Sequence, residues 1–201
     1  MKTMKYSICI SGAASGKTVE PAKKLAQRIG VEVARLGHIV TTGATIGLPY
    51  YGAQAAKKAG GMSIGFSPAS SLREHLYKYR LPIGVYDFIN FTGMHYVGRD
   101  IHLVQSSDAI ITVGGRFGSL HEFTTALEAN MPCGVLLGSG GTADEIPDLM
   151  NKLEPPNRNM VVFDDNPERL LKSVIALLDE DLKDIDLTVE RSSWFLDKDK
   201  H

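Results

Sequence analysis

The chain has 201 residues, 43% of them hydrophobic and 22% charged, with a formal net charge of -1. This composition fits one globular domain with a sizeable core and excludes a disordered chain. The near-zero charge, without a long Lys/Arg run, argues against a nucleic-acid or anionic-membrane surface, so we expect a small ligand. Residues 1–28 contain no continuous apolar signal segment and no apolar run reaches the length of a membrane span, which makes the cytoplasm the expected location.

Strand-like apolar runs alternate with helical periodicity along the whole chain, the pattern of a parallel α/β sheet. Strands are expected near residues 5–10, 38–42, 62–66, 85–91, 108–113, 132–137 and 160–163. Helices are expected near residues 18–36, 48–59, 93–106, 119–130, 142–153 and 166–180. The polar, basic stretch 70–80 is either a surface loop or a short helix. We therefore predict an α/β fold, a Rossmann-like open parallel sheet of about seven strands with helices on both faces.

This organisation predicts a single Rossmann-like nucleotide-binding domain over residues 1–201, with a charged C-terminal extension from about residue 181. The one apolar cluster of that extension, Trp194-Phe195-Leu196, is expected to dock on the body or on a partner subunit. The two cysteines, Cys9 and Cys133, fall in or beside predicted strands, which suits buried, reduced thiols.

Four glycine-rich loops follow predicted strands at their carboxyl ends. They cover residues 11–16, 42–47, 114–118 and 138–142. Open parallel sheets bind ligands along this edge, where backbone amides and helix N-termini converge. Glycine lets N–H groups approach an anion closely, and a helix N-terminus favours negative charge. The loops therefore predict a site for a nucleotide or sugar phosphate.

The loop at 114–118 leads into a helix expected to begin near Ser119, with Glu122 in its first turn. A carboxylate beside a bound anion has two interpretations. Ser119-x-x-Glu122 is a capping box, in which each side chain satisfies an amide at the helix start. Alternatively, Glu122 is a chemical group of the site. The segment by itself leaves both interpretations open.

The helix expected over residues 93–106 has an apolar stripe and a polar arc. The stripe holds Met94, Val97, Ile101 and Val104, and the opposite arc holds His95, Arg99 and His102. That arc faces either water or the cleft. An arginine facing the cleft would form a fork onto a phosphate or orient a carboxylate.

Several familiar motifs do not fit. Residues 11–18 end in Gly-Lys-Thr, but only three residues separate Gly12 from Gly16 where a P-loop needs four. A G-x-G-x-x-G motif with an acidic residue about twenty positions later is also missing. The six histidines lack metal-ligand spacing, so we expect no metal. Neither Ser11 nor Ser119 has an obvious partner base for a serine hydrolase.

Residues 108–122 resemble the P-G-G-x-G-T-x-x-E signature of the LOG ("lonely guy") phosphoribohydrolases, long misnamed lysine decarboxylases. Aligned on the glutamate, Glu122 falls on the catalytic Glu and Ser119 on the Thr of the signature. Arg99 falls on the family's catalytic Arg, in a helix that likewise begins with Met-His. The likeness extends over about residues 5–180 and includes further matches at Gly12–Gly16, Gly43, Gly47-Leu48, Ile64-Gly65, Gly115 and Gly118.

The resemblance implies a homodimeric hydrolase that cleaves the N-glycosidic bond of a nucleoside 5'-monophosphate, such as AMP or a modified AMP, without a cofactor. Arg99 and Glu122 would be its catalytic residues. The nucleotide and its phosphate would lie against Gly12, Ala13, Gly43, Gly47, Gly115, Arg116, Phe117, Gly118 and Ser119.

The chain also departs from the signature. Gly114 replaces its proline, Arg116 its second glycine and Asp100 the lysine that follows the catalytic Arg, while Pro49-Tyr50-Tyr51 lengthens the second loop. These departures concern the substrate more than the fold. Related proteins, including molybdenum-cofactor carriers and DNA-processing sensors, bind ligands without hydrolysing them. A non-catalytic nucleotide or molybdenum-cofactor carrier, with Ser119 and Glu122 acting only as a cap, therefore remains the alternative hypothesis.

Overall fold

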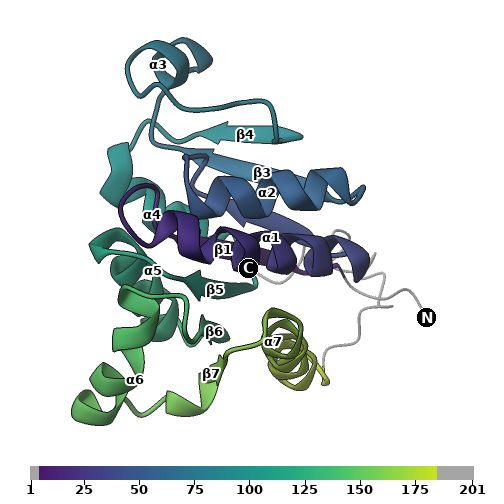
Figure 1. Ribbon diagram of the computed structural model, residues 1–201, viewed down its shortest axis with the longest axis vertical. Helices are drawn as coiled ribbons and strands as arrows, with labels where there is room; N and C mark the ends of the chain where they lie inside the picture. Colours follow the sequence, from purple (N-terminus) through teal and green to yellow (C-terminus); the bar gives the residue numbers. More distant parts are fainter. Residues whose placement is uncertain (1–4, 185–201) are drawn as a thin grey trace, which may run out of the picture.

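The computed structural model describes residues 5–184, which form an open sheet of seven parallel strands with helices on both faces (Figure 1). The strands are β1 (Ser7–Gly12), β2 (Ile39–Thr42), β3 (Met62–Ser67), β4 (Phe88–Phe91), β5 (Ala109–Val113), β6 (Cys133–Leu136) and β7 (Val161–Asp164). The helices are α1 (Val19–Arg35), α2 (Leu48–Lys58), α3 (Leu72–Tyr77), α4 (His95–Gln105), α5 (Phe117–Glu128), α6 (Thr142–Leu153) and α7 (Pro167–Asp181). The predicted α/β fold class is confirmed.

The element boundaries differ from the prediction in a few places. Strand β1 runs through Gly12, so the first glycine loop begins two residues later than expected. Helix α5 begins at Phe117, two residues early, and the stretch 70–80 contains the short helix α3. A 3-10 helix at Arg158–Met160 was not predicted. The Trp194 cluster lies outside the described residues.

The strands form the core because their side chains are apolar on both faces, as parallel sheets require. Helices α1, α2 and α7 cover one face and α4, α5 and α6 the other, with a cluster of buried side chains under each layer (Figure 1). All five residues of β5 are buried. Cys9 and Cys133 are buried and free under the second layer, as predicted.

The strand order is β4-β3-β2-β1-β5-β6-β7, so it reverses between β1 and β5. From β1 the chain runs outward to β4, and α4 then carries it back to β5, beside β1. The loops that follow β1 and β5 lead to opposite faces of the sheet and leave a crevice between them. The second glycine loop follows β2, next to this crevice.

Helix α4 presents a different face to the sheet than its apolar pattern predicts. Met94, Val97 and Ile101 of the predicted stripe are exposed, with 68% of Val97 accessible to solvent. The buried residues are instead Arg99, Asp100, Leu103 and Val104. The prediction was wrong because burial of a polar side chain depends on partners elsewhere in the fold, which helical periodicity does not contain.

Helices α1 and α2 pack closely because glycines meet at their crossing. A side chain at Gly30 would overlap the carbonyl oxygen of Gly52. None of the helices in residues 5–184 is both long and apolar enough to cross a bilayer.

The α1–α2 crossing predicts the effect of adding a methyl group there. We expect Gly30→Ala to lower the free energy of unfolding by about 1–3 kcal/mol, because backbone must move to admit the new atom. Gly84→Ala is the matched control: its Cβ meets no atom within 4 Å, and we expect a change within roughly 0.5 kcal/mol. Urea unfolding of both variants tests this. Equal stabilities would contradict the proposed close contact.

Candidate functional site

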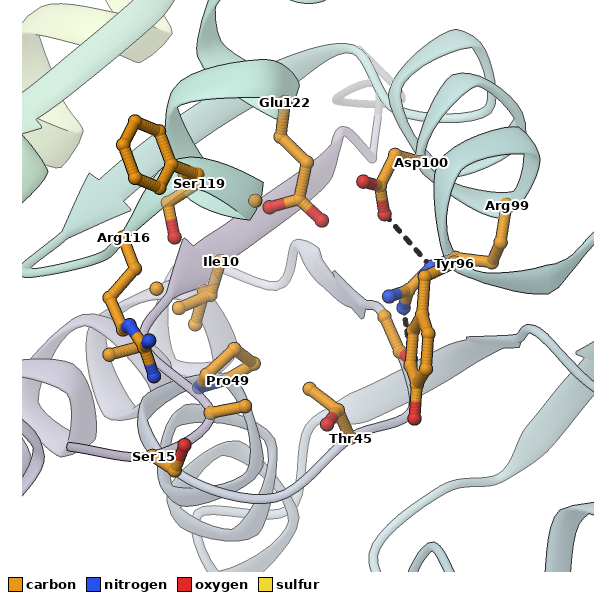
Figure 2. A pocket seen from close by; sticks show the side chains of 16 residues that line it. Ile10, Ser15, Thr45, Pro49, Tyr96, Arg99, Asp100, Arg116, Ser119 and Glu122 are labelled. Carbon is orange, nitrogen blue, oxygen red and sulfur yellow. Dashed lines mark hydrogen bonds and ion pairs between the residues drawn. The ribbon is translucent and has the colours of Figure 1, made fainter. Parts of the chain in front are cut away.

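A pocket of about 330 Å³ opens at the carboxyl ends of the central strands (Figure 2). It brings together nine of the eleven residues expected from the sequence: Gly12, Ala13, Gly43, Arg99, Arg116, Phe117, Gly118, Ser119 and Glu122. They come from three glycine loops, each of which follows a different strand, and from helices α4 and α5. The structure therefore assembles the expected residues around one cavity at the point where the strand order reverses.

The other two expected residues, Gly47 and Gly115, shape the pocket without lining it. Gly47 precedes α2 at φ 78°, and a side chain there would overlap the carbonyl oxygens of Ala13 and Ala14. Gly115 has φ 108°, and its Cβ would lie 2.7 Å from that of Ser119. Both positions need glycine so that the loops can approach each other.

Seven further residues line the pocket that were not predicted as site residues: Ile10, Ala14, Ser15, Thr45, Pro49, Tyr96 and Asp100. Tyr96 and Asp100 lie on α4 beside Arg99, and the Tyr96 ring lies 5.8 Å from the Arg99 guanidinium carbon. Asp100 was noticed only as a departure from the signature. The position of Asp100 next to Arg99 was the one feature of the sequence that could have indicated its place in the pocket.

Glu122 does not belong to a capping box. Arg116 is the N-cap of α5 and no side chain caps the helix, so Glu122 lies in the second turn. Its carboxylate accepts a hydrogen bond from the Ser11 hydroxyl of β1, and 8% of the residue is exposed. The helix-cap interpretation was wrong because the helix begins two residues earlier than the Ser119-x-x-Glu122 pattern suggests.

Burial governs the charge on Glu122. Loss of hydration raises the pKa of its carboxyl, and the nearby Asp100 carboxylate raises it further. The Arg99 guanidinium and the Ser11 hydrogen bond oppose this, and the result is a pKa of about 7. A carboxyl group that titrates near neutral pH in a cleft can exchange a proton with a ligand.

The guanidinium of Arg99 is buried and faces the cleft, which settles the choice between water and cleft for that side chain. Its Nη1 donates hydrogen bonds to the carbonyl oxygens of Gly43 and Phe66, the latter at 3.2 Å. Its Nε lies 3.0 Å from Asp100 Oδ1, close enough for an ion pair although the N–H is not aligned for a hydrogen bond. His95 and His102 are exposed. Among the described residues, Nη2 has no hydrogen-bond partner and is left for a ligand.

The backbone amides at the start of α5 form a part of the pocket that is suited to an anion. Within residues 5–184 no acceptor pairs with the backbone N–H groups of residues 115–119. Unpaired amides at the N-terminus of a twelve-residue helix are suited to an anion. The Arg116 side chain extends from the same turn toward the loop after β1 (Figure 2).

The fourth glycine loop, 138–142, has a structural role. The Asp144 carboxylate accepts hydrogen bonds from the N–H groups of Gly138 and Gly140, at 2.7 and 3.0 Å. The Ser139 hydroxyl accepts one from Gly114 N–H, at 2.7 Å. These amides are therefore not free for a ligand. This loop lies outside the pocket lining and braces the loop before α5.

Sequence comparison identifies the family. Residues 5–171 match the model of the SLOG cluster4 family. This chain belongs to the SLOG cluster4 family. An uncharacterized protein of Archaeoglobus fulgidus is 31% identical to it over 114 residues, which cover 57% of this chain and 70% of that protein.

Two solved structures extend the comparison of this family member. The molybdenum cofactor binding protein from Rippkaea orientalis is 25% identical with a TM-score of 0.72, covering 88% of this chain and 99% of that one. The molybdenum cofactor carrier protein from Chlamydomonas reinhardtii is 25% identical with a TM-score of 0.71, covering 87% and 99%. The resemblance noted in the sequence is thus confirmed at the level of the superfamily.

Among the described residues, no group of three or more His, Cys, Asp or Glu side chains could hold a metal ion.

The raised pKa of Glu122 predicts a pH-dependent stability. Between its ordinary value of 4.5 and the folded value of about 7, the folded chain binds more protons than the unfolded chain. Its free energy of unfolding should therefore fall as the pH rises through this window. Glu122→Gln cannot ionise, so its stability relative to the wild type should increase by about 2–3 kcal/mol from about pH 5 to about pH 8.

Urea unfolding at the two pH values measures this difference. Glu145→Gln, the same change at an exposed site on α6, is the control and should track the wild type. Parallel curves for Glu122→Gln and the wild type would mean that Glu122 ionises normally in the folded protein.

Proposed function

We propose that this protein hydrolyses the N-glycosidic bond of a nucleoside 5'-monophosphate, such as AMP or a modified AMP, to a free base and ribose 5-phosphate. The observation that carries the proposal is the buried Glu122 carboxyl, which lies in one pocket with Arg99 and with the unpaired amides of residues 116–119. The pocket therefore combines an anion site with a carboxyl group that can exchange a proton. No cofactor is required for this reaction.

The phosphate would bind at the start of α5. The amides of residues 116–119 supply donors, and the helix dipole favours negative charge there. The Arg116 guanidinium extends from the same turn and would add a charged donor. Gly12, Ala13 and Gly118 have small side chains or none, so they would let the nucleotide lie close to the loops.

The ribose would then lie near Glu122. Cleavage of an N-glycosidic bond passes through an oxocarbenium-like state, which a carboxylate stabilises by its charge. Glu122 would supply that stabilisation or take a proton from the attacking water. The free Nη2 of Arg99 would bind the sugar or the base, and the Tyr96 ring at the pocket wall would stack on the base.

A carrier for a nucleotide or for the molybdenum cofactor is the second candidate. It is favoured by the two 25% identical structures, one of a molybdenum cofactor binding protein and one of a molybdenum cofactor carrier. Under this proposal the same loop amides and Arg116 would hold the phosphate of the cargo. Glu122 would then contribute to binding without a chemical step.

The base-release assay separates the two candidates. Purified protein is incubated with a panel of nucleoside monophosphates, and free base is measured by chromatography. Glu122→Gln should fold and bind the preferred substrate but lose roughly 10²–10⁴ in rate, because an amide neither exchanges the proton nor balances the cationic charge. Glu145→Gln should keep the wild-type rate. Tight binding without base release in the wild type would overturn the hydrolase and favour the carrier.

We also propose that the protein is a homodimer, as the LOG resemblance implies. Support comes from the exposed apolar side chains along α4, where Met94, Val97 and Ile101 lie beside the pocket residue Tyr96. An exposed apolar stripe of this kind is suited to a protein interface. A second copy bound there would lie next to the mouth of the pocket.

Light scattering should accordingly give twice the mass of one chain. Val97→Asp puts a charge into the stripe and should yield monomers, because an unpaired charge in an apolar interface is costly. Leu153→Asp changes an equally exposed apolar residue on α6 and should leave the dimer intact. A wild-type protein whose mass by light scattering is that of one chain at micromolar concentration would refute the interface.

A further inference from the structure

The pocket holds a second carboxyl group whose surroundings differ from those of Glu122. Asp100 projects from α4 and Glu122 from α5, and both side chains point into the space between the two helices (Figure 2). The exposed fractions of the two residues are only 6% and 8%. Two buried carboxyl groups so close together do not both ionise easily, because each charge raises the energy of the other.

Asp100 has a nitrogen atom of a basic side chain close to each of its carboxylate oxygens. Its Oδ1 lies 3.0 Å from Arg99 Nε and its Oδ2 lies 3.1 Å from His121 Nδ1. Among the residues that the structure describes, Glu122 accepts a side-chain hydrogen bond only from the neutral hydroxyl of Ser11. The positive charge of Arg99 lies directly against Asp100, and the Asp100 carboxylate in turn raises the pKa of the Glu122 carboxyl, because like charges repel.

We propose that Asp100 is a positioning residue for Glu122: its anchored carboxylate keeps a proton on the glutamate, so that Glu122 enters the N-glycosidic reaction as an acid. This proposal rests on the hydrolase function proposed above. It decides between the roles that the pocket geometry leaves open for Glu122, because a protonated carboxyl can donate a proton but cannot accept one from water.

The other groups that face Glu122 are consistent with this assignment. From β1 come Ser11 and the buried Cys9, whose thiol pKa is raised by its own burial and by the charge of Glu122. From α4 come Arg99 and Asp100, which act in opposite directions on the pKa of Glu122. Burial adds to the effect of Asp100, and together they outweigh Arg99 and Ser11.

The acid role gives a balanced reaction. The proton on Glu122 passes to a nitrogen of the leaving base while the C1'–N bond breaks and its electron pair stays with the base. Water then adds to the cationic C1' and returns one proton to the Glu122 carboxylate. One water molecule is consumed, and the glutamate is again protonated for the next cycle.

Carbon NMR tests the electrostatic part without any substrate. The protein is labelled with ¹³C at the glutamate side-chain carboxyls, and the signal missing from Glu122→Gln identifies Glu122. In the wild type this signal should titrate near pH 7. In Asp100→Asn its midpoint should fall by about 1 pH unit or more, since the like charge is gone. Asp148→Asn, the same change on the surface of α6, should leave it in place.

A wild-type midpoint at the ordinary glutamate value, or an unchanged midpoint in Asp100→Asn, overturns the proposal. Melting curves establish that each variant is folded. Should Asp100→Asn not fold, Asp100→Ser is measured instead, because the smaller hydroxyl leaves room for a water beside Arg99. We expect the midpoint of the Glu122 titration to fall in Asp100→Ser as it does in Asp100→Asn.

The pH dependence of base release from AMP tests the acid role. For the wild type, kcat/KM should fall about tenfold per pH unit above the Glu122 midpoint, where the proton is lost. In Asp100→Asn the fall in kcat/KM should begin at a lower pH, by the shift that NMR measures. A rate that rises through the midpoint would make Glu122 a base and refute the acid role. The expected NMR shifts without any base release would instead refute the hydrolase and leave the carboxyl pairing established.

Discussion

The buried guanidinium of Arg99 holds the pocket together. Its hydrogen bonds to the carbonyl oxygens of Gly43 and Phe66 tie α4 to the ends of β2 and β3, and its ion pair orients Asp100. The contact requires glycine at position 43, because any side chain there would overlap the guanidinium. An arginine that helical periodicity places on a polar arc is thus part of the protein interior. Its burial is tolerated because Asp100 lies against its charge and two carbonyl oxygens accept hydrogen bonds from Nη1.

This arrangement decides how α4 lies on the sheet. Since Arg99 and Asp100 turn inward with Leu103 and Val104, the apolar residues one stripe away face solvent. A functional site and a candidate interface are therefore two faces of one helix. The exposed apolar residues of α4 lie beside Tyr96, which lines the pocket.

The protonation state of Glu122 is the second property that characterises the site. Arg99 and Asp100 pull the charge of Glu122 in opposite directions, and burial tips the balance toward the protonated form. At the other end of the pocket, free amides and Arg116 are arranged for an anion. A ligand that spans both ends would carry a phosphate at one side and a group able to take or give a proton at the other, which is the chemistry of a nucleotide.

The sequence by itself determined the α/β class, the seven strands and most of the pocket residues, because apolar periodicity and glycine loops are local signals and parallel strands end at one edge. It also directed attention to Arg99 and Glu122. Only the tertiary structure decided that Glu122 bonds to Ser11, 111 residues away, that Asp100 joins the pocket, and that the loop at 138–142 is a brace. These features depend on which side chains meet after folding. Burial and pairing of polar groups are properties of that assembly and leave no period in the sequence.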